Sequence, residues 1–580
     1  MESSVSLVES KERAVAHRPS SRGPSSRLTF VSMSSALFLL LVTLVTGSQA
    51  ANERPSIDTA NERPSIDNRL LHLSSSVAVR AWLANPGTAP EYIRPQIEAL
   101  ASARDAGAVQ RSSPSSTTSV SQFNRFNEDV LGLPQNEESL TVCPSRPRVT
   151  LGGTNDYRGL LNPRGNFTGW HFSFNGGRSL NNEGLLPAVD VRGAQRPSGG
   201  DPVSATGRNC SLYSASLNYD PNDPFGSSNG IGVYRSTPRR LADCPGGDAK
   251  SCWPNRRAVA TNRPGHFLDK EWMTVGRSGS AGSVVWTTYS DFDFTADNPA
   301  GFTAQIYAVR CSANLATCTN PILISGNDED VQFSDVTIGP DGRTYVTWSE
   351  IRGELEGTPQ TFIHKLRVAP AGSTNFGPTR IVHREELAIP FGGKLNASEF
   401  RVATYPKNTV AKVGGKPRVF VTWDACSVRV LGETVCEDAV VKLSWSDDRG
   451  RTWHGPVTVS VRGQNYFPTI DTDPFRNRVL VGYFTSRYDL GFDNRQDVEL
   501  VTLDSRQPRQ PIDRQRLTSP SNEPEADPLL GGIFIGDYIE VVALNGKAYL
   551  HYNANYVAVP LLAEGLPIPQ QDNFIARTRQ

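Results

Sequence analysis

The stretch Ser446-Asp447-Asp448-Arg449-Gly450-Arg451-Thr452-Trp453 has the form S-x-D-x-G-x-T-W. These residue types in this order suit a tight turn between two β-strands. The Asp448 carboxylate can accept backbone N–H groups, Gly450 can take a positive φ, and Trp453 can pack beneath the turn. Degenerate copies stand at Ser173–Leu180 and at Ser312–Thr317. We therefore expect one kind of turn to recur in a β-rich chain.

Short β-rich runs with a large aromatic residue recur on both sides of this turn. Trp286, Trp348, Trp423 and Tyr483 follow one another at 62, 75 and 60 residues. Most of these runs have a strand-like segment before and after them. A period of this length is typical of propeller blades with long loops. We count seven such units between residues 141 and 580, and a strand at each end of the chain would close the ring.

The composition of the 580 residues fits this fold class. Lys and Arg number 59 and Asp and Glu number 59, so the net charge is zero and a broad nucleic-acid-binding face is not expected. Gly (49) and Pro (41) are abundant and Met (3) is rare. This favours many short strands and turns over a helical bundle.

The N-terminus has the features of an export signal. Four arginines lie in residues 1–27, an apolar run covers Ala36–Val45, and small residues lead to Ala50. We expect cleavage after Ala50 and a secreted, cell-surface or periplasmic protein. The alternative is an uncleaved single-pass anchor, because Leu28–Gly47 is about long enough to span a bilayer. That segment is the only expected contact with a membrane.

Residues 51–140 separate the signal at 1–50 from the β-rich region at 141–580. A nine-residue unit is duplicated over residues 51–67 and is expected to be a disordered spacer. Helical stretches are expected at Ser75–Asn85 and Pro90–Ala106. We interpret 51–140 as a linker with a small helical segment, with a pro-region as the alternative.

Eight cysteines suit an oxidising compartment. None forms a C-x-x-C pair, so no zinc knuckle is indicated. Three pairs are close in sequence, namely Cys244 with Cys252, Cys311 with Cys318, and Cys426 with Cys436. Cys143 and Cys210 remain as a fourth pair. We predict four disulfides on this pattern, although sequence alone leaves the connectivity open.

The spacing of Ser446–Trp453 resembles the Asp-box, or bacterial neuraminidase repeat, of the sialidase superfamily. The resemblance covers roughly residues 141–580 as a pattern. It implies an all-β, secreted propeller of four-stranded blades, six-bladed in catalytic members against the seven units counted here. In that family the Asp-box is structural, which implies a role in the fold for Ser446, Asp448, Gly450, Thr452 and Trp453.

The resemblance also implies a chemistry. Family members clamp a substrate carboxylate with three arginines, use a Tyr–Glu pair as nucleophile and base, and use an Asp as acid/base. Catalytic members carry Arg-Ile-Pro or Arg-Leu-Pro near the first blade. This chain has neither, and Arg146-Pro147-Arg148 is the nearest stretch.

Polar residues precede several of the expected inner strands, whose leading ends form one face of a propeller channel. We expect a site there. The candidate catalytic residues are Arg401, Glu399, Tyr405, Asp269 and Asp201. The candidate binding residues are Asp335, Tyr466, Asp537, Tyr538 and Arg487. The alternative for each Asp is a turn cap, and for Arg487 a surface ion pair.

Two functions remain open from the sequence. The first is a glycoside hydrolase of the exo-α-sialidase type acting on extracellular glycans or glycoproteins. The second is a non-catalytic propeller that binds a glycan or a protein. A monomer without a cofactor is expected. Calcium in the loop Asn218–Asp223 is the alternative, because its oxygen-rich side chains suit that ion.

Overall fold

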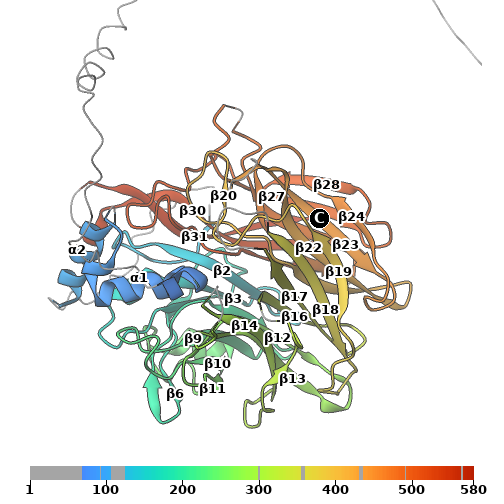
Figure 1. Ribbon diagram of the computed structural model, residues 1–580, viewed down its shortest axis with the longest axis horizontal. Helices are drawn as coiled ribbons and strands as arrows, with labels where there is room; N and C mark the ends of the chain where they lie inside the picture. Colours follow the sequence, from blue (N-terminus) through green and yellow to red (C-terminus); the bar gives the residue numbers. More distant parts are fainter. Residues whose placement is uncertain are drawn as a thin grey trace, which may run out of the picture. The chain divides into compact units, whose positions relative to one another are not determined.

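The computed structural model describes residues 68–91, 93–105, 124–297, 301–328, 330–353, 360–429, 435–473, 475–489, 491–563 and 566–580. These residues form an all-β propeller of seven blades (Figure 1). The expected signal sequence at 1–50 and the spacer at 51–67 lie outside the described residues. No helix within the described ranges is long and apolar enough to cross a membrane.

Each blade is an antiparallel sheet whose strands follow chain order from the channel outward, apart from the last strand of blade 7. Blade 1 consists of β2 (Gln135–Val142), β3 (Thr150–Asp156), β4 (Thr168–Ser173) and β5 (Asn182–Leu185). Blade 2 consists of β8 (Val203–Thr206), β9 (Leu212–Asn218), β10 (Gly230–Ser236) and β11 (Asn255–Thr261). Blade 3 consists of β12 (His266–Arg277), β13 (Ser283–Asp293), β14 (Thr303–Ser312) and β15 (Ile322–Leu323). Blades 4 and 5 are β16 (Val331–Ile338), β17 (Thr344–Arg352), β18 (Thr361–Ala369), β19 (Arg380–Glu385); and β21 (Lys407–Val413), β22 (Lys416–Arg429), β23 (Val435–Ser446), β24 (His454–Thr458). Blades 6 and 7 are β25 (Asn465–Asp473), β26 (Arg478–Thr485), β27 (Asp497–Asp504), β28 (Pro511–Arg516); and β29 (Glu540–Leu544), β30 (Lys547–Val559), β31 (Ile568–Arg579), β1 (Asn124–Arg125).

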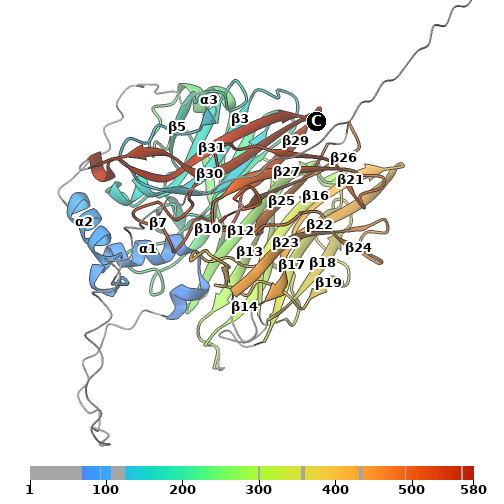
Figure 2. The same cartoon turned by 90° about the horizontal axis from the view of Figure 1, so that it is seen from above.

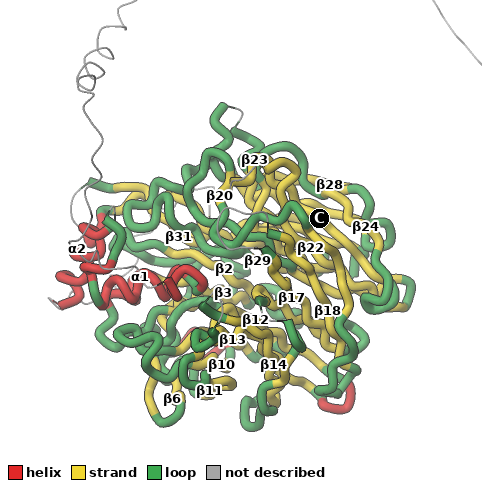
Figure 3. Tube along the Cα trace, viewed as in Figure 1, coloured by secondary structure: helices red, strands yellow, loops and turns green. Residues whose placement is uncertain are grey.

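A few elements lie outside this scheme. The strand β20 (Lys394–Leu395) runs parallel to β23, and β6 (Val189–Val191) pairs with β7 (Ala194–Arg196). The α-helices are α1 (Ser75–Ala84), α2 (Arg94–Asp105) and α3 (Pro238–Asp243). Figures 2 and 3 show α1 and α2 together beside the sheets. They occupy the two stretches for which helices were predicted.

The ring closes through the two ends of the described propeller. Asn124 of β1 pairs with Ile575 of β31, so an N-terminal strand completes the last blade. This confirms the expected strand at each end. The propeller therefore begins at Asn124, upstream of the boundary drawn at 141. The first inner strand, β2, also begins before residue 141, at Gln135; its Gln, Asn and Glu residues are buried at the channel although they are polar, so their pattern did not predict a strand.

The aromatic residues that set the sequence period lie in the second strands of blades 3 to 6. Trp286, Trp348 and Trp423 in β13, β17 and β22 are fully buried, as is Tyr483 in β26. Trp286 and Trp348 belong to one apolar cluster formed by blades 3 and 4. A ring side chain fills the space between neighbouring twisted sheets, which explains why these four units each keep one.

The stretch Ser446–Trp453 forms the turn between β23 and β24. Gly450 N donates to Ser446 Oγ at 2.7 Å, and Thr452 N donates to Asp448 Oδ1 at 2.8 Å. Burial alone would raise the pKa of Asp448, but its hydrogen bonds with Thr452 and Ser446 lower it to about 2. Gly450 has a φ of 84°. The degenerate copies repeat the geometry, since Gly177 N donates to Ser173 Oγ and Thr317 N donates to Ser312 Oγ, both at 3.1 Å.

All four disulfides match the predicted pairs. They join Cys143 to Cys210, Cys244 to Cys252, Cys311 to Cys318, and Cys426 to Cys436. Structural disulfides persist in oxidising compartments, which indicates an extracellular or periplasmic protein.

The turn at Gly450 yields a stability prediction. A Cβ at this residue would lie 2.4 Å from Leu366 Cδ2 on the neighbouring blade, in a backbone conformation that L residues rarely adopt. Gly414 also has a positive φ, but a Cβ there meets open space. We expect Gly450→Ala to lower the free energy of unfolding by about 2–4 kcal/mol and Gly414→Ala by about 1 kcal/mol. Equal losses in urea unfolding would show that the clash does not matter.

Candidate functional site

Four inner strands share one irregularity near their N-terminal ends. In β2, β12, β16 and β25 the pairing register shifts where two residues lie opposite a single residue of the next strand; the pairs are 137–138, 270–271, 333–334 and 467–468. The first residue of each pair has a positive φ although none is glycine; these are Glu137, Lys270, Phe333 and Phe467. A bulge turns side chains away from the alternation of a regular strand. Here it directs several polar side chains to the same end of the channel.

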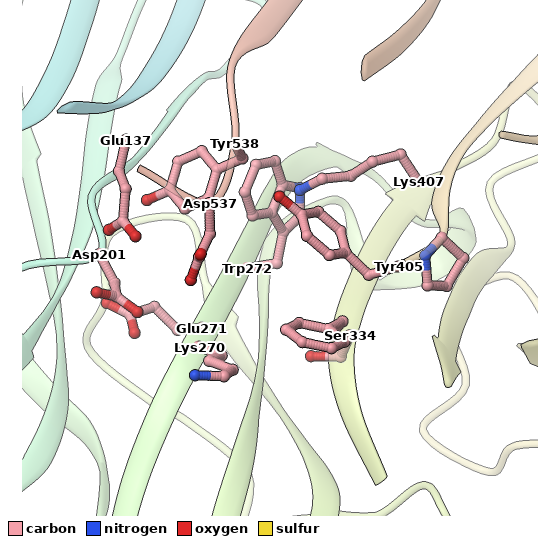
Figure 4. A pocket seen from close by; sticks show the side chains of 12 residues that line it. Glu137, Asp201, Lys270, Glu271, Trp272, Ser334, Tyr405, Lys407, Asp537 and Tyr538 are labelled. Atoms are coloured by element: carbon pink, nitrogen blue, oxygen red, sulfur yellow. The ribbon is translucent and has the colours of Figure 1, made fainter. Parts of the chain in front are cut away.

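These side chains enclose a cavity of about 40 Å³. Six of the seven blades contribute to it, and its lining residues are Glu137, Asp201, Lys270, Glu271, Trp272, Phe333, Ser334, Tyr405, Pro406, Lys407, Asp537 and Tyr538. Figure 4 shows the carboxyl groups of Glu137, Asp201 and Asp537 and the ring of Tyr538 directed toward a shared space. Residues far apart in sequence therefore meet at this cavity.

Several polar atoms on this cavity lack a protein partner. Among the described residues, the buried atoms Asp201 Oδ1, Glu271 Oε1 and Oε2, Ser334 Oγ and Tyr405 OH form no hydrogen bond. Folded proteins pair almost all buried polar atoms, because an unpaired one costs about 1–3 kcal/mol. A group of such atoms on one cavity is typical of a site that recognises a ligand.

The carboxyl groups perturb one another. Burial raises the pKa of Glu137 well above its usual range, and the charges of Asp201 and Asp537 raise it further. Burial and the charge of Asp269 raise the pKa of Asp201 to about 7. Burial and Asp201 likewise raise the pKa of Glu271. Protonated carboxyls near neutral pH are proton donors, and this is how many enzymes obtain a general acid.

The cations around the cavity have different partners. Arg401 Nε lies 3.1 Å from Asp537 Oδ1 in a forked ion pair, and Lys270 Nζ lies 3.1 Å from Asp269 Oδ2. Lys407 Nζ lies 2.9 Å from the centroid of the Trp272 ring. Burial lowers the pKa of Lys407 to about 8. The pocket thus holds an ion-paired carboxylate, Asp537, beside carboxyls that favour the protonated form.

The N-terminal helical segment covers part of this region. Ser74 N donates to Asp269 Oδ2 at 2.9 Å, and Leu73 O accepts from Arg401 Nη1 at 3.0 Å. Arg80 is buried, with its guanidinium carbon 4.5 Å from the centroid of Tyr219. Val77 and Trp82 join the apolar core that includes Tyr219 and Phe534. The segment at 68–105 is therefore packed onto the propeller near the carboxyl cluster.

The structure brings together six of the ten candidate residues from the sequence. Asp201, Tyr405, Asp537 and Tyr538 line the cavity. Asp269 and Arg401 lie directly behind it, where they pair with Lys270 and Asp537. The polar residues before the inner strands therefore do converge.

The other four candidates lie elsewhere. Glu399 is exposed, pairs with Lys394 and does not line the cavity. Asp335 accepts from the backbone N–H of Asn408. Tyr466 OH donates to Gln496 at 2.9 Å, and Arg487 pairs with Glu499. These contacts are the structural roles that polar groups near strand ends commonly fill.

Eight lining residues were not among the ten candidates: Glu137, Lys270, Glu271, Trp272, Phe333, Ser334, Pro406 and Lys407. Glu137 lies in a polar run that was not recognised as an inner strand. Lys407 and Trp272 follow Tyr405 and Asp269 closely, so the position of those neighbours was the available signal. Ser334 has no distinguishing pattern in the sequence.

In the loop Asn218–Asp223, considered above as a calcium site, the Asp side chains make ordinary turn contacts. Asp220 accepts from Asn222 N at 3.0 Å, and Asp223 accepts from Gly226 N at 2.9 Å. Among the described residues, no group of three or more His, Cys, Asp or Glu side chains is placed to hold a metal ion.

No family model matches the chain, and neither does any curated protein. Among solved structures it is similar to a protein of unknown function from Dyadobacter fermentans, with 12% identity over 68% of this chain and 98% of that chain and a TM-score of 0.41. A Hadza microbial sialidase shares 13% identity over 71% and 73%, with a TM-score of 0.39. A polysaccharide lyase, an ulvan lyase, shares 8% over 79% and 95%, with a TM-score of 0.42. Identities and TM-scores this low carry no argument about function.

The raised pKa of Asp201 predicts a pH-dependent stability. Burial favours the protonated form of Asp201. The contribution of this group to the free energy of unfolding is therefore complete below pH 3.8 and is lost as the pH rises through about 7. We expect Asp201→Asn to gain stability relative to the parent protein between pH 4 and pH 7, as measured by urea unfolding across that range. Asp513→Asn, at an exposed carboxyl, is the control and should show a flat difference. A flat difference for Asp201→Asn as well would mean that this carboxyl is ionised in the folded protein.

The Ser74 contact predicts how the N-terminal segment is held. Ser74→Pro keeps the φ of −54° but removes the N–H that donates to the buried Asp269. We expect it to lower the free energy of unfolding by about 1–3 kcal/mol. Ser75→Pro is the matched control, because proline is tolerated at the first residue of a helix. The Asp269 contact would be unimportant if both variants unfolded at the same urea concentration.

Proposed function

We propose that this pocket is the active site of a glycoside hydrolase that acts on extracellular glycans. The observation that supports the proposal best is the set of unpartnered carboxyl and hydroxyl oxygens of Asp201, Glu271, Ser334 and Tyr405 on one cavity. A sugar presents hydroxyl groups that can satisfy such atoms. The aromatic residues Trp272, Tyr405 and Tyr538 on the same cavity suit the apolar face of a sugar ring.

The carboxyl groups can divide the work of glycoside hydrolysis. Glu137, whose pKa is raised, would give its proton to the glycosidic oxygen as the bond to the anomeric carbon breaks. The Asp537 carboxylate would attack that carbon or activate the water that does so. Arg401 would orient the carboxylate of Asp537 through the forked ion pair.

A sialoside substrate has weaker support. Clamping a substrate carboxylate as sialidases do requires three arginines. Among the described residues, we identify Arg401 as the arginine that contacts the cavity lining, and it is already paired with Asp537. The other cations there are Lys270 and Lys407, which lack a planar fork. We therefore extend the proposal to glycosides in general, with α-sialosides as one member of the substrate panel.

The size of the cavity favours the second candidate function. A volume of about 40 Å³ holds roughly one or two water molecules but no sugar ring. Hydrolysis therefore requires the surrounding side chains or the segment at 68–76 to move. A non-catalytic propeller that binds a glycan or protein on its outer surfaces needs no such movement.

Hydrolysis of fluorogenic glycosides, with α-sialosides included, tests the proposal. We expect Glu137→Gln and Asp537→Asn each to lower kcat by about 100-fold to 10,000-fold, because each removes a proton donor or a carboxylate from the reacting centre. Glu399→Gln is the matched control, since its exposed carboxyl lies outside the cavity and pairs with Lys394, and its turnover should equal that of the parent protein.

The outcomes separate the two functions. Turnover that survives both pocket substitutions would place the active site elsewhere. If the parent protein hydrolysed no glycoside on the panel while a glycan array showed binding, the propeller would be a binding protein.

A further inference from the structure

A groove lies on the outer side of the propeller where blade 4 meets the turn Ser446–Trp453 of blade 5. Its volume is about 250 Å³. Four arginines line it, namely Arg343, Arg380, Arg449 and Arg451. We call it the first arginine groove. It contains none of the residues of the channel cavity.

A second arginine groove, of about 490 Å³, lies on the other side of the same turn. Its cationic residues are Arg418, Arg506 and Arg509, and Trp445 and His454 line it as well. The two rings of Trp445 and His454 are stacked with their centroids 5.6 Å apart. Asp447 belongs to the second groove and Asp448 to the first, so the turn alone separates the two.

Carboxylates in the grooves neutralise only part of this charge. In the second groove Arg418 forms an ion pair with Asp447 at 2.6 Å. Arg343 and Arg449 share one partner, Asp341, at 3.5 and 3.4 Å. The oxygens of Asp448 accept hydrogen bonds from Thr452 within the turn. Within the described part of the chain, Arg380, Arg451, Arg506 and Arg509 form no ion pair; Arg380 instead donates to the backbone oxygen of Arg449.

This excess is local and does not reflect a basic protein. The whole chain carries equal numbers of basic and acidic residues. Burial and the neighbouring charge of Arg451 lower the pKa of Arg380, which means that the cations are crowded in the first groove. A bound oxyanion would relieve that crowding, and guanidinium forks match the geometry of sulfate and carboxylate.

We propose that the two arginine grooves form one binding surface for an anionic polysaccharide that bears sulfate esters or uronic carboxylates and crosses the turn Ser446–Trp453. A polymer fits better than a single ion, because two grooves with unneutralised cations flank one short turn. The four disulfides indicate an extracellular or periplasmic protein, where anionic glycans are available. The choice of a glycan over another polyanion rests in part on the proposed function, but the surface would act without turnover in the channel.

Direct binding tests this surface independently of hydrolysis. The probes are dextran sulfate, polygalacturonate and uncharged dextran, measured with the full-length protein at 50 and 300 mM salt. We expect the two anionic polymers to bind and dextran not to bind, with weaker binding at the higher salt because charge pairs at a surface are screened. The polymer that binds more tightly distinguishes sulfate from carboxylate recognition.

The decisive variant is Arg451→Glu combined with Arg509→Glu, which places one charge reversal in each groove. We expect it to weaken binding of the favoured anionic polymer by about tenfold or more. The matched control combines Arg192→Glu with Arg384→Glu, two exposed arginines outside both grooves. Arg384 lies four residues beyond Arg380 on β19, about 13 Å along the strand, which exceeds the screening length of roughly 6 Å at 300 mM salt. The control should retain affinity within about twofold.

Several results would overturn the proposal. Equal losses of affinity in the groove variant and the control would show that binding depends on net charge and not on the grooves. Dextran binding as tightly as dextran sulfate would remove the role of the oxyanion. Tighter binding of a single-stranded oligodeoxynucleotide of equal charge would identify a nucleic-acid surface instead. Unfolding curves of both variants must match the parent protein, which both sets of exposed positions should allow.

Discussion

Closure of the ring is the constraint on which the rest of the structure depends. Blade 7 takes its outermost strand, β1, from the N-terminal side of the propeller, so the last blade is completed by residues far away in sequence. Arg125 pairs with the buried Asp572, and Phe126 is fully buried between His171 and His551. Without this closure, β2 and β29 would not face each other, and Glu137 would not meet Asp537.

The closed ring also permits an arrangement that a single sheet could not hold. Carboxyl groups from different blades are buried within reach of one another, at a cost that only a surrounding rigid scaffold can sustain. The bulged inner strands and the positive φ at Glu137 and Lys270 belong to the same arrangement. Ser74 of the helical segment donates to Asp269 of the cluster, and Arg80 donates to the backbone oxygen of Ser198, which ties the region before the propeller to its channel.

The local features of the fold could be predicted from the sequence. The turn at Ser446–Trp453 was predictable because its hydrogen bonds join residues within four positions of one another. Three of the disulfides close short loops, and the aromatic residues of β13, β17, β22 and β26 repeat because every blade packs against its neighbour in the same way. For the site, the polar residues that precede strands identified Asp201, Tyr405 and Asp537, but the same rule selected Glu399, which faces solvent. The inner strand β2 escaped notice because its polar residues read as surface while the channel buries them.

The sequence by itself determined that the chain is a repeated all-β structure with four disulfides and a recurring capped turn, because these features depend on neighbours along the chain. Only the tertiary structure decided which polar residues meet. Arg401 binds Asp537 rather than Glu399, and Lys407 lies over Trp272. Seven arginines line the two grooves beside the turn Ser446–Trp453. Such contacts join different blades, and their partners are set by the blade number and the register of each inner strand. Residue type and spacing along the chain carry no record of either.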